Sequence, residues 1–166
     1  MAMNPCPCGY QGHPRIPCRC PPAHVLRYRS RVSGPLLDRI DLRIDLPPPL
    51  FDELAPAPAH QRSGPISCEP RGADLRARVL SARERMAARQ GPLRNAELQA
   101  DDLDRLVLLL SESRKILQRA VTHRGLSARA TQAVRRVART LADLDGQDSV
   151  EPKHVAQALA LRSPVV

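Results

Sequence analysis

The sequence contains almost no aromatic residues, with one Phe, two Tyr and no Trp among 166 residues. Proteins that bind single-stranded nucleic acid by stacking its bases need aromatic side chains, so this class is nearly excluded. The longest apolar cluster, Leu106–Leu110, is far too short to cross a membrane. Residues 1–4 have neither the charged region nor the apolar core of an export signal. We therefore expect a cytoplasmic protein with a core of Leu, Val, Ile and Ala.

The sequence also lacks the motifs that hold ATP. It contains no Gly-x4-Gly-Lys-Ser/Thr phosphate loop, and no apolar strand ends in the paired acids that bind magnesium. We therefore expect no ATPase activity from the isolated chain.

Positive charge is abundant. The formal net charge is +9 and the sequence pI is about 10.3, and arginine supplies nearly all of the excess. This balance favours polyanionic partners such as DNA or nucleotide phosphates. The 17 prolines concentrate in the first half of the chain, whereas the second half has the pattern of nearly uninterrupted helix.

Five cysteines in a chain without an export signal indicate thiols or metal ligands in place of disulfides. Four of them form two Cys-x-Cys pairs in a Gly/Pro-rich loop: Cys6, Cys8, Cys18 and Cys20. Four thiolates suffice for a tetrahedral structural Zn²⁺ site, with His13 as a substitute ligand. The alternative is a reduced loop with unligated thiols. We assign no role to Cys68.

The segment Ser33–Leu46 combines a Ser-Gly-Pro break, a short helical turn and then alternating apolar and charged residues. This alternation predicts a strand with Ile40, Leu42, Ile44 and Leu46 on one side. Arg39 lies at the junction, where its guanidinium can project from the surface. The alternative is an ordinary surface Asp-Arg pair.

Helical periodicity dominates the rest of the chain. A short helix is expected within residues 21–31, and a compact bundle of amphipathic helices within residues 72–162. The first bundle helix carries an apolar stripe and ends at Gly91-Pro92. The apolar stripe of that helix is Leu75, Val79, Ala82 and Met86, a turn is predicted at 95–100, and the next apolar face is Leu103, Leu106, Val107 and Leu110. Three further helices are predicted: one from N-cap Ser111 to Gly125, one from N-cap Ser127 to Asp145-Gly146, and a last helix at Glu151–Leu161.

Several of these motifs together resemble the magnesium-chelatase-like AAA+ ATPases of bacteria, the ComM/YifB type. The matching stretches are Met3–Gly9, Cys18–Cys20, Ser33–Asp41, Leu126–Ala130 and Arg136–Leu144. The resemblance covers essentially the whole chain and implies the C-terminal portion of such a protein. The fold it implies is mainly α, a C-terminal helical lid bundle preceded by a partial α/β core remnant with a Cys-rich loop. The implied domains are residues 1–46 (core remnant), 47–71 (Pro-rich linker) and 72–162 (helical lid).

The resemblance also implies roles for three residues. Asn4 matches the sensor-1 asparagine that orients the attacking water, and Arg39 matches the arginine finger that reaches a neighbouring subunit's site. Arg129 matches the sensor-2 arginine that contacts the nucleotide of its own subunit. The implied cofactors are ATP and Mg²⁺, held only by an intact or complemented module.

Members of this family assemble as hexameric rings, and the ComM type is linked to DNA branch migration during natural transformation. The implied partners are therefore further copies in a ring, or an N-terminal ATPase half, together with DNA. Two alternatives remain: a non-enzymatic, basic helical module with a zinc-type loop that binds nucleic acid, and an adaptor that docks on an acidic partner.

Overall fold

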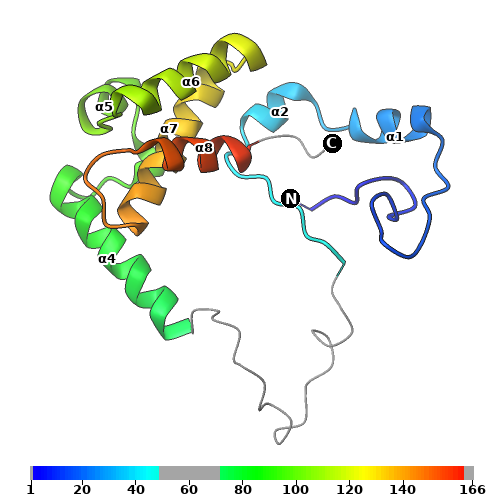
Figure 1. The fold of residues 1–166 in the computed structure, drawn as a ribbon, viewed down its shortest axis with the longest axis horizontal. Coiled ribbons are helices and arrows are strands. Elements are labelled where there is room, and N and C mark those ends of the chain that lie inside the picture. The colour runs from blue at the N-terminus through cyan, green and yellow to red at the C-terminus, as the bar shows by residue number, and fades with distance from the viewer. Residues whose placement is uncertain (1, 49–71, 163–166) are drawn as a thin grey trace, which may run out of the picture. The chain divides into compact units, whose positions relative to one another are not determined.

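The structure, a computed structural model, describes residues 2–48 and 72–162, which are mainly helical and contain no strand (Figure 1). The mainly α fold expected from the sequence is thus confirmed. The chain divides into two compact units. We call their described parts the cysteine unit, residues 2–37 and 45–48, and the helical unit, residues 38–44 and 72–162. Cys68 and most of the Pro-rich stretch 47–71 lie outside the described residues.

The cysteine unit consists of the Cys-rich loop and two short helices. Helix α1, Pro22–Arg29, begins with a proline, whose fixed φ suits the first helical turn. Arg29 of α1 holds the loop by donating from Nε to the Pro5 carbonyl and from Nη2 to Gln11 Oε1, both at 3.3 Å. Helix α2, Gly34–Asp38, follows at the boundary of the unit.

The strand expected after Arg39 does not form. Residues 40–48 have no regular secondary structure, and Leu42, Ile44 and Leu46 are exposed. A strand needs a neighbour to complete its backbone hydrogen bonds, and none is present among the described residues. Instead, the Arg43 amide donates to the Leu161 carbonyl at 2.7 Å, which ties the segment to the end of the last helix.

The helical unit contains five α-helices and one 3₁₀ turn within the described residues. Their bounds are α4 Gly72–Gln90, η2 Asn95–Glu97, α5 Ala100–Leu106, α6 Ser111–Arg124, α7 Ala128–Leu144 and α8 Pro152–Ala160. Left-handed glycines follow α4 and α6, Gly91 at φ +69° and Gly125 at φ +61°, as the sequence predicts.

Helix α7 forms the centre of this unit, since α4, η2, α5 and α8 all pack against it (Figure 1). Its small buried residues recur at helical spacing, Ala130, Ala133, Val134, Ala138 and Ala142, and let the neighbouring helices approach closely. The core around them contains mostly Leu and Val, including Leu98, Leu103, Leu117, Val150 and Val155. Helix α6 packs on α8.

Two local predictions are corrected by the structure. Leu75 and Val79, expected on the buried stripe of α4, are 46% and 44% exposed, whereas Ala82 is buried. The packed part of α4 therefore begins near Ala82. The N-cap of α6 is Leu110 and not Ser111, which is the first helical residue. By contrast, Ser127 caps α7 as predicted, because its Oγ accepts a hydrogen bond from the Ala130 amide at 3.1 Å.

Among the described residues, no helix has both the length and the apolar character needed to span a bilayer.

Candidate functional site

The four cysteines of the loop lie together. The Sγ atoms of Cys6 and Cys8 are 3.3 Å apart, and each lies 3.6 Å from the Sγ of Cys18. With Cys20, all four sulfurs fall within 4.8 Å of one another. A tetrahedral zinc ion with Zn–S bonds of about 2.3 Å separates its sulfurs by about 3.8 Å. The donor set and its spacing therefore fit one metal ion with four thiolate ligands.

Tight turns bring the two Cys-x-Cys pairs to this point. The amide of Gly9 donates to the Cys6 carbonyl at 3.0 Å, and Gly9 has φ +83°, which a residue with a Cβ adopts only at a cost. In the second pair, the Cys20 amide points at the Cys18 sulfur at 3.5 Å. Cys6 is fully buried, so at least one of the four sulfurs is shielded from solvent.

Hydrogen bonding distributes the protons unevenly over these thiols. The Tyr10 backbone, followed by the Cys6 thiol, lowers the pKa of Cys8 to about 6. The hydrogen bond with Cys8 raises the pKa of Cys20 to about 12. Zinc binds thiolates, so its binding would displace the remaining protons, and its affinity would rise with pH.

His13 does not belong to this group of ligands. Its Nδ1 accepts hydrogen bonds from the amides of Arg15 and Ile16, at 3.1 and 3.0 Å. The imidazole therefore stabilises the turn between the two cysteine pairs, and the group of potential metal ligands contains only cysteines.

The three residues matched to nucleotide sensing are all exposed, but they belong to different units. Asn4 lies in the cysteine unit, beside the turn at Gly9. Arg39 and Arg129 both lie in the helical unit. The structure thus places two of the three candidates on one compact body.

Arg162 fixes the segment that carries Arg39. Its guanidinium donates to the Ile40 carbonyl at 2.9 Å and to the Asp38 carbonyl at 3.3 Å, and the carboxylates of Asp41 and Asp38 lie 3.7 and 3.8 Å away. Burial, followed by the charge of Arg43, lowers the pKa of Arg162 below its ordinary value. No local sequence pattern marks Arg162, because its partners are more than a hundred residues earlier in the chain.

A second tether connects the same segment to α7. The Ser127 hydroxyl donates to Asp38 Oδ2 at 2.8 Å while it accepts from the Ala130 amide. Ser127 is the N-cap of the helix whose first turn carries Arg129. The residue before Arg39 is therefore bonded to the cap of the helix that bears Arg129.

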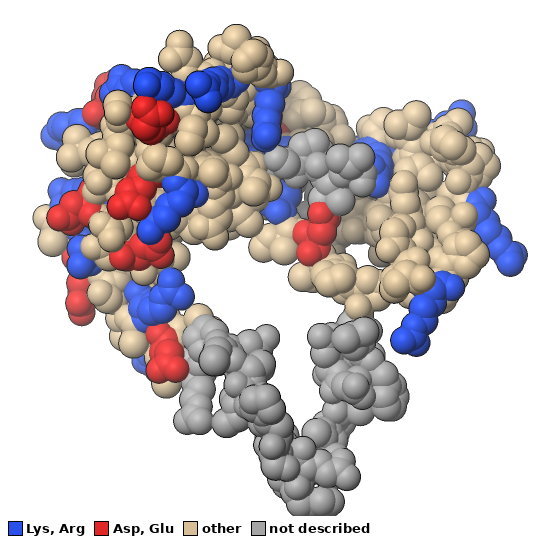
Figure 2. Space-filling view, in the orientation of Figure 1, with Lys and Arg blue, Asp and Glu red and all other residues tan. Residues whose placement is uncertain are grey.

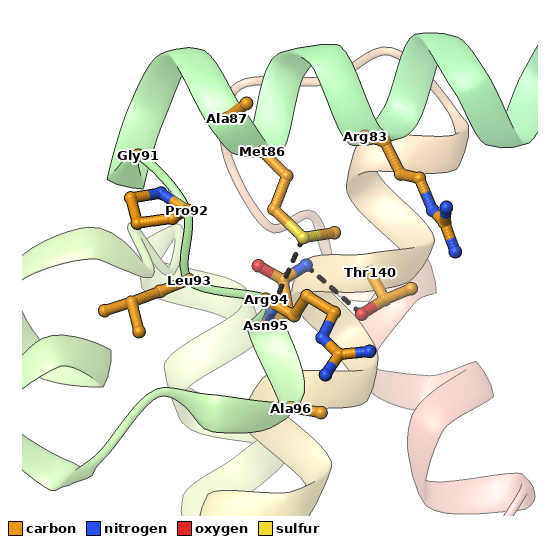
Figure 3. A pocket seen from close by; sticks show the side chains of 10 residues that line it. All are labelled: Arg83, Met86, Ala87, Gly91, Pro92, Leu93, Arg94, Asn95, Ala96 and Thr140. Atoms are coloured by element: carbon orange, nitrogen blue, oxygen red, sulfur yellow. Dashed lines mark hydrogen bonds between the residues drawn. The ribbon is translucent and has the colours of Figure 1, made fainter.

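A pocket of about 460 Å³ lies beside α4, η2 and α7 (Figure 3). Inside it, the backbone amide of Asn95 donates a hydrogen bond to Met86 Sδ at 3.3 Å, and the side-chain Nδ2 of Asn95 donates one to Thr140 Oγ1 at 3.2 Å. Asn95 also donates to Asp143 and accepts from Arg89. The polar groups of Asn95 and Thr140 are therefore hydrogen-bonded within the protein and are not left open for a ligand. We assign no ligand to this pocket.

Charges of both signs are interspersed on the face of the helical unit drawn in Figure 2. Helix α6 departs from this balance, since it has four arginines or lysines and one acidic residue. These basic residues are Arg114, Lys115, Arg119 and Arg124. The helix is therefore a candidate surface for a polyanion.

Comparison with known families accounts for both parts of the chain. The family model described as magnesium chelatase, subunit ChlI C-terminal, matches residues 69–162, and the model described as magnesium chelatase, subunit ChlI, matches residues 1–54. The chain therefore belongs to the magnesium chelatase ChlI family.

The chain is similar in sequence to several bacterial proteins. It is 39% identical over 165 residues to the uncharacterized protein YifB of Escherichia coli, a match that covers 98% of this chain and 30% of YifB. It is 36% identical over 165 residues to the competence protein ComM of Haemophilus influenzae, which covers 99% of this chain and 30% of ComM. The chain thus spans about 30% of the length of the curated relatives it matches.

Proposed function

We propose that this chain supplies nucleotide-sensing residues to an ATP-driven hexameric ring that remodels DNA. In this proposal Arg39 reaches the nucleotide of a neighbouring subunit, Arg129 contacts the nucleotide of its own subunit, and Asn4 orients the attacking water. The observation that carries it is the pair of exposed arginines on one unit, linked through Asp38 and Ser127. DNA branch migration is the task that we propose for the ring, as the resemblance to the ComM type implies.

The residue types suit these roles. A guanidinium is permanently charged and planar, so it can stabilise the charge that spreads over a transferring phosphoryl group. An amide side chain both donates and accepts hydrogen bonds, so Asn4 can hold a water in a fixed orientation. ATP with Mg²⁺ would supply the phosphoryl group, and the residues of this chain would contact it only from the sensing and trans-acting sides.

The phosphate loop of the proposed site comes from outside these residues, from an N-terminal ATPase half or a complementing chain. Residues 1–46 would then complete the nucleotide-binding core, with their segment 38–44 attached to the helical unit. Residues 47–71 would link the core to the lid, and residues 72–162 would form the lid. ATP turnover by the ring, which we place in the cytoplasm, would move the lid, and this movement would act on DNA.

We further propose that Cys6, Cys8, Cys18 and Cys20 hold one structural Zn²⁺. The sulfur spacing supports this, and four thiolates leave no open position for a substrate. The role of such an ion is to stabilise a loop that has little hydrophobic core of its own.

The first experiment measures ATP hydrolysis by the purified chain, alone and with a phosphate-loop-containing N-terminal half. We expect activity only in the mixture, and a loss of about 1,000-fold on Arg39→Ala. Arg76→Ala, an exposed arginine of α4, is the control and should leave the rate unchanged. An active mixture that tolerates Arg39→Ala would contradict the assignment of Arg39.

A second candidate is a non-enzymatic module that binds nucleic acid, which the basic surface of α6 favours. Contacts to phosphates make affinity fall steeply as salt rises. Arg39→Ala should leave DNA affinity largely intact if Arg39 serves ATP turnover, and should lower it if Arg39 touches DNA. Titration of DNA at several salt concentrations separates the two candidates.

A further inference from the structure

The backbone on both sides of Arg39 is held by a single side chain. Arg162, only 6% exposed, donates a hydrogen bond from Nη2 to the carbonyl of Asp38 and another from Nη1 to the carbonyl of Ile40. These are the residues directly before and after Arg39. Fixing both carbonyls fixes the direction in which the side chain of Arg39 leaves the backbone.

Two further bonds complete the attachment of this segment to the helical unit. The Arg43 amide donates to the Leu161 carbonyl at 2.7 Å, directly before Arg162 in the chain. At the other end, Asp38 accepts from the Ser127 hydroxyl at the start of α7. The segment is thus held at both ends, and its attachment includes the N-cap of the helix that carries Arg129.

We propose that Arg162 is a positioning residue that makes Arg39 move together with Arg129. This inference rests on the proposed function, in which Arg39 serves one nucleotide site and Arg129 the next. Both arginines are then parts of one rigid body. When a change in the nucleotide at Arg129 moves the lid, Arg39 therefore moves in the neighbouring site as well. The clamp thereby couples successive sites of the ring through rigid structure.

The chemistry of Arg162 favours arginine over lysine at this position. Two carbonyls on either side of one residue require two N–H donors in a fixed fork, which a guanidinium provides and a single ammonium does not. The carboxylates of Asp38 and Asp41, each within 4 Å, offset its buried charge. Arg162→Lys therefore keeps the charge and loses the fork.

The first arm of the test needs no ATPase activity and uses the full chain. Amide hydrogen exchange is measured at Arg43, within the clamped segment, and at Val150, in the core of the helical unit. Arg162→Lys should accelerate exchange at Arg43 by about tenfold or more while Val150 changes little. Arg162→Met gives the same comparison without the charge, and Arg119→Met on the surface of α6 is the control. Unchanged exchange at Arg43, or equal acceleration at both amides, would overturn the clamp.

The second arm measures ATP turnover with the N-terminal half present. A small misplacement of a catalytic group costs up to about 100-fold, so Arg162→Lys should lower kcat by about that factor with little change in KM for ATP. In the Arg39→Ala background, Arg162→Lys should have no additional effect, since it acts through Arg39. Independent, multiplicative losses would show a merely structural role and overturn the proposal.

The two arms separate this inference from the proposed function. If Arg39→Ala leaves turnover unchanged, the assignment of Arg39 fails and the coupling fails with it. If Arg39→Ala abolishes turnover but Arg162→Lys frees the segment without lowering kcat, the proposed function stands and the clamp is overturned.

Discussion

Arg89, in the last turn of α4, donates hydrogen bonds from both of its terminal nitrogens to the carboxylate of Asp143 in α7, at 2.7 and 2.9 Å. Arg139 donates to the same carboxylate at 2.9 Å, and Asn95 donates to it at 2.8 Å. The side chains of Asp143 and Arg139 are 1% and 0% exposed. One buried carboxylate thus joins α4, η2 and α7, and its two arginines depend on it for their charge balance.

Removing that charge should be costly. Asp143→Asn keeps the shape of the side chain but leaves two arginines without a counter-charge, and we expect it to lower the free energy of unfolding by about 3 kcal/mol. Urea denaturation of the full chain measures this change. The control is Asp148→Asn, whose exposed carboxylate contacts Arg85 at 3.5 Å and should leave the midpoint unchanged. Equal effects of the two substitutions would contradict the buried network.

The same carboxylate should make stability depend on pH in the acid range. Burial raises the pKa of Asp143, but hydrogen bonds from Arg89 and Asn95 outweigh it and hold the pKa below its ordinary value. A lowered folded pKa contributes stability above the unfolded value of about 3.9 and loses it as the pH falls through the folded value. The urea midpoint of the wild type should therefore fall more steeply below pH 4 than that of Asp143→Asn. Parallel curves would show that Asp143 titrates normally.

The sequence predicts the helices of this unit well because each is marked locally, by caps, glycines and a 3.6-residue period. It does not predict the Asp143 network. Arg139 and Asp143 stand four residues apart on α7, a spacing equally typical of an exposed ion pair. Only the packing of α4 and η2 against that face shows that the pair is buried.

The two serines at the starts of α6 and α7 provide a matched pair for testing helix capping. Ser127→Ala should lower the free energy of unfolding by about 1 kcal/mol, because the Ala130 amide loses its acceptor. Ser111→Ala should have a much smaller effect, because Ser111 is inside α6 and Leu110 is its N-cap. Urea denaturation of both variants gives the comparison. A larger loss for Ser111→Ala would contradict the assignment of the caps.

Metal content tests the cysteine cluster. We expect the purified chain to bind one Zn²⁺, measured by native mass spectrometry, and Cys18→Ser to reduce the bound metal because it leaves three thiolates. Cys68→Ser is the matched control and should retain the ion. Zinc binding that survives Cys18→Ser but is lost on Cys68→Ser would place the metal elsewhere.

Removal of this ion should act on the cysteine unit alone. A chelator should accelerate amide exchange around Gly9 and His13, because the turns there would lose the metal ion that holds the two cysteine pairs together. Exchange in α7 should not change. Acceleration in both units would show that the ion stabilises more than its own loop.

The candidate site is predictable from the sequence to different degrees. The cysteine spacing identifies the four candidate ligands because they lie within fifteen residues of one another. Residues that act through distant partners leave no such pattern: neither Arg162 nor the bond from Ser127 to Asp38 follows from the local sequence. The alternation at Ile40–Leu46 even predicts a strand, because a period of two describes the segment but not whether a neighbour is present.

Val150, between α7 and α8, is buried and has both of its backbone groups bonded: its amide donates to Leu108, and its carbonyl accepts from Leu110 and from the Ser113 hydroxyl. These bonds join the segment before α6 to the segment before α8, and Val150 belongs to the core of the unit. Solvent should therefore reach the Val150 amide only during global opening of the unit. The exchange rate of this amide therefore reports the global stability of the helical unit. A change in exchange elsewhere in that unit is local when the rate at Val150 stays the same.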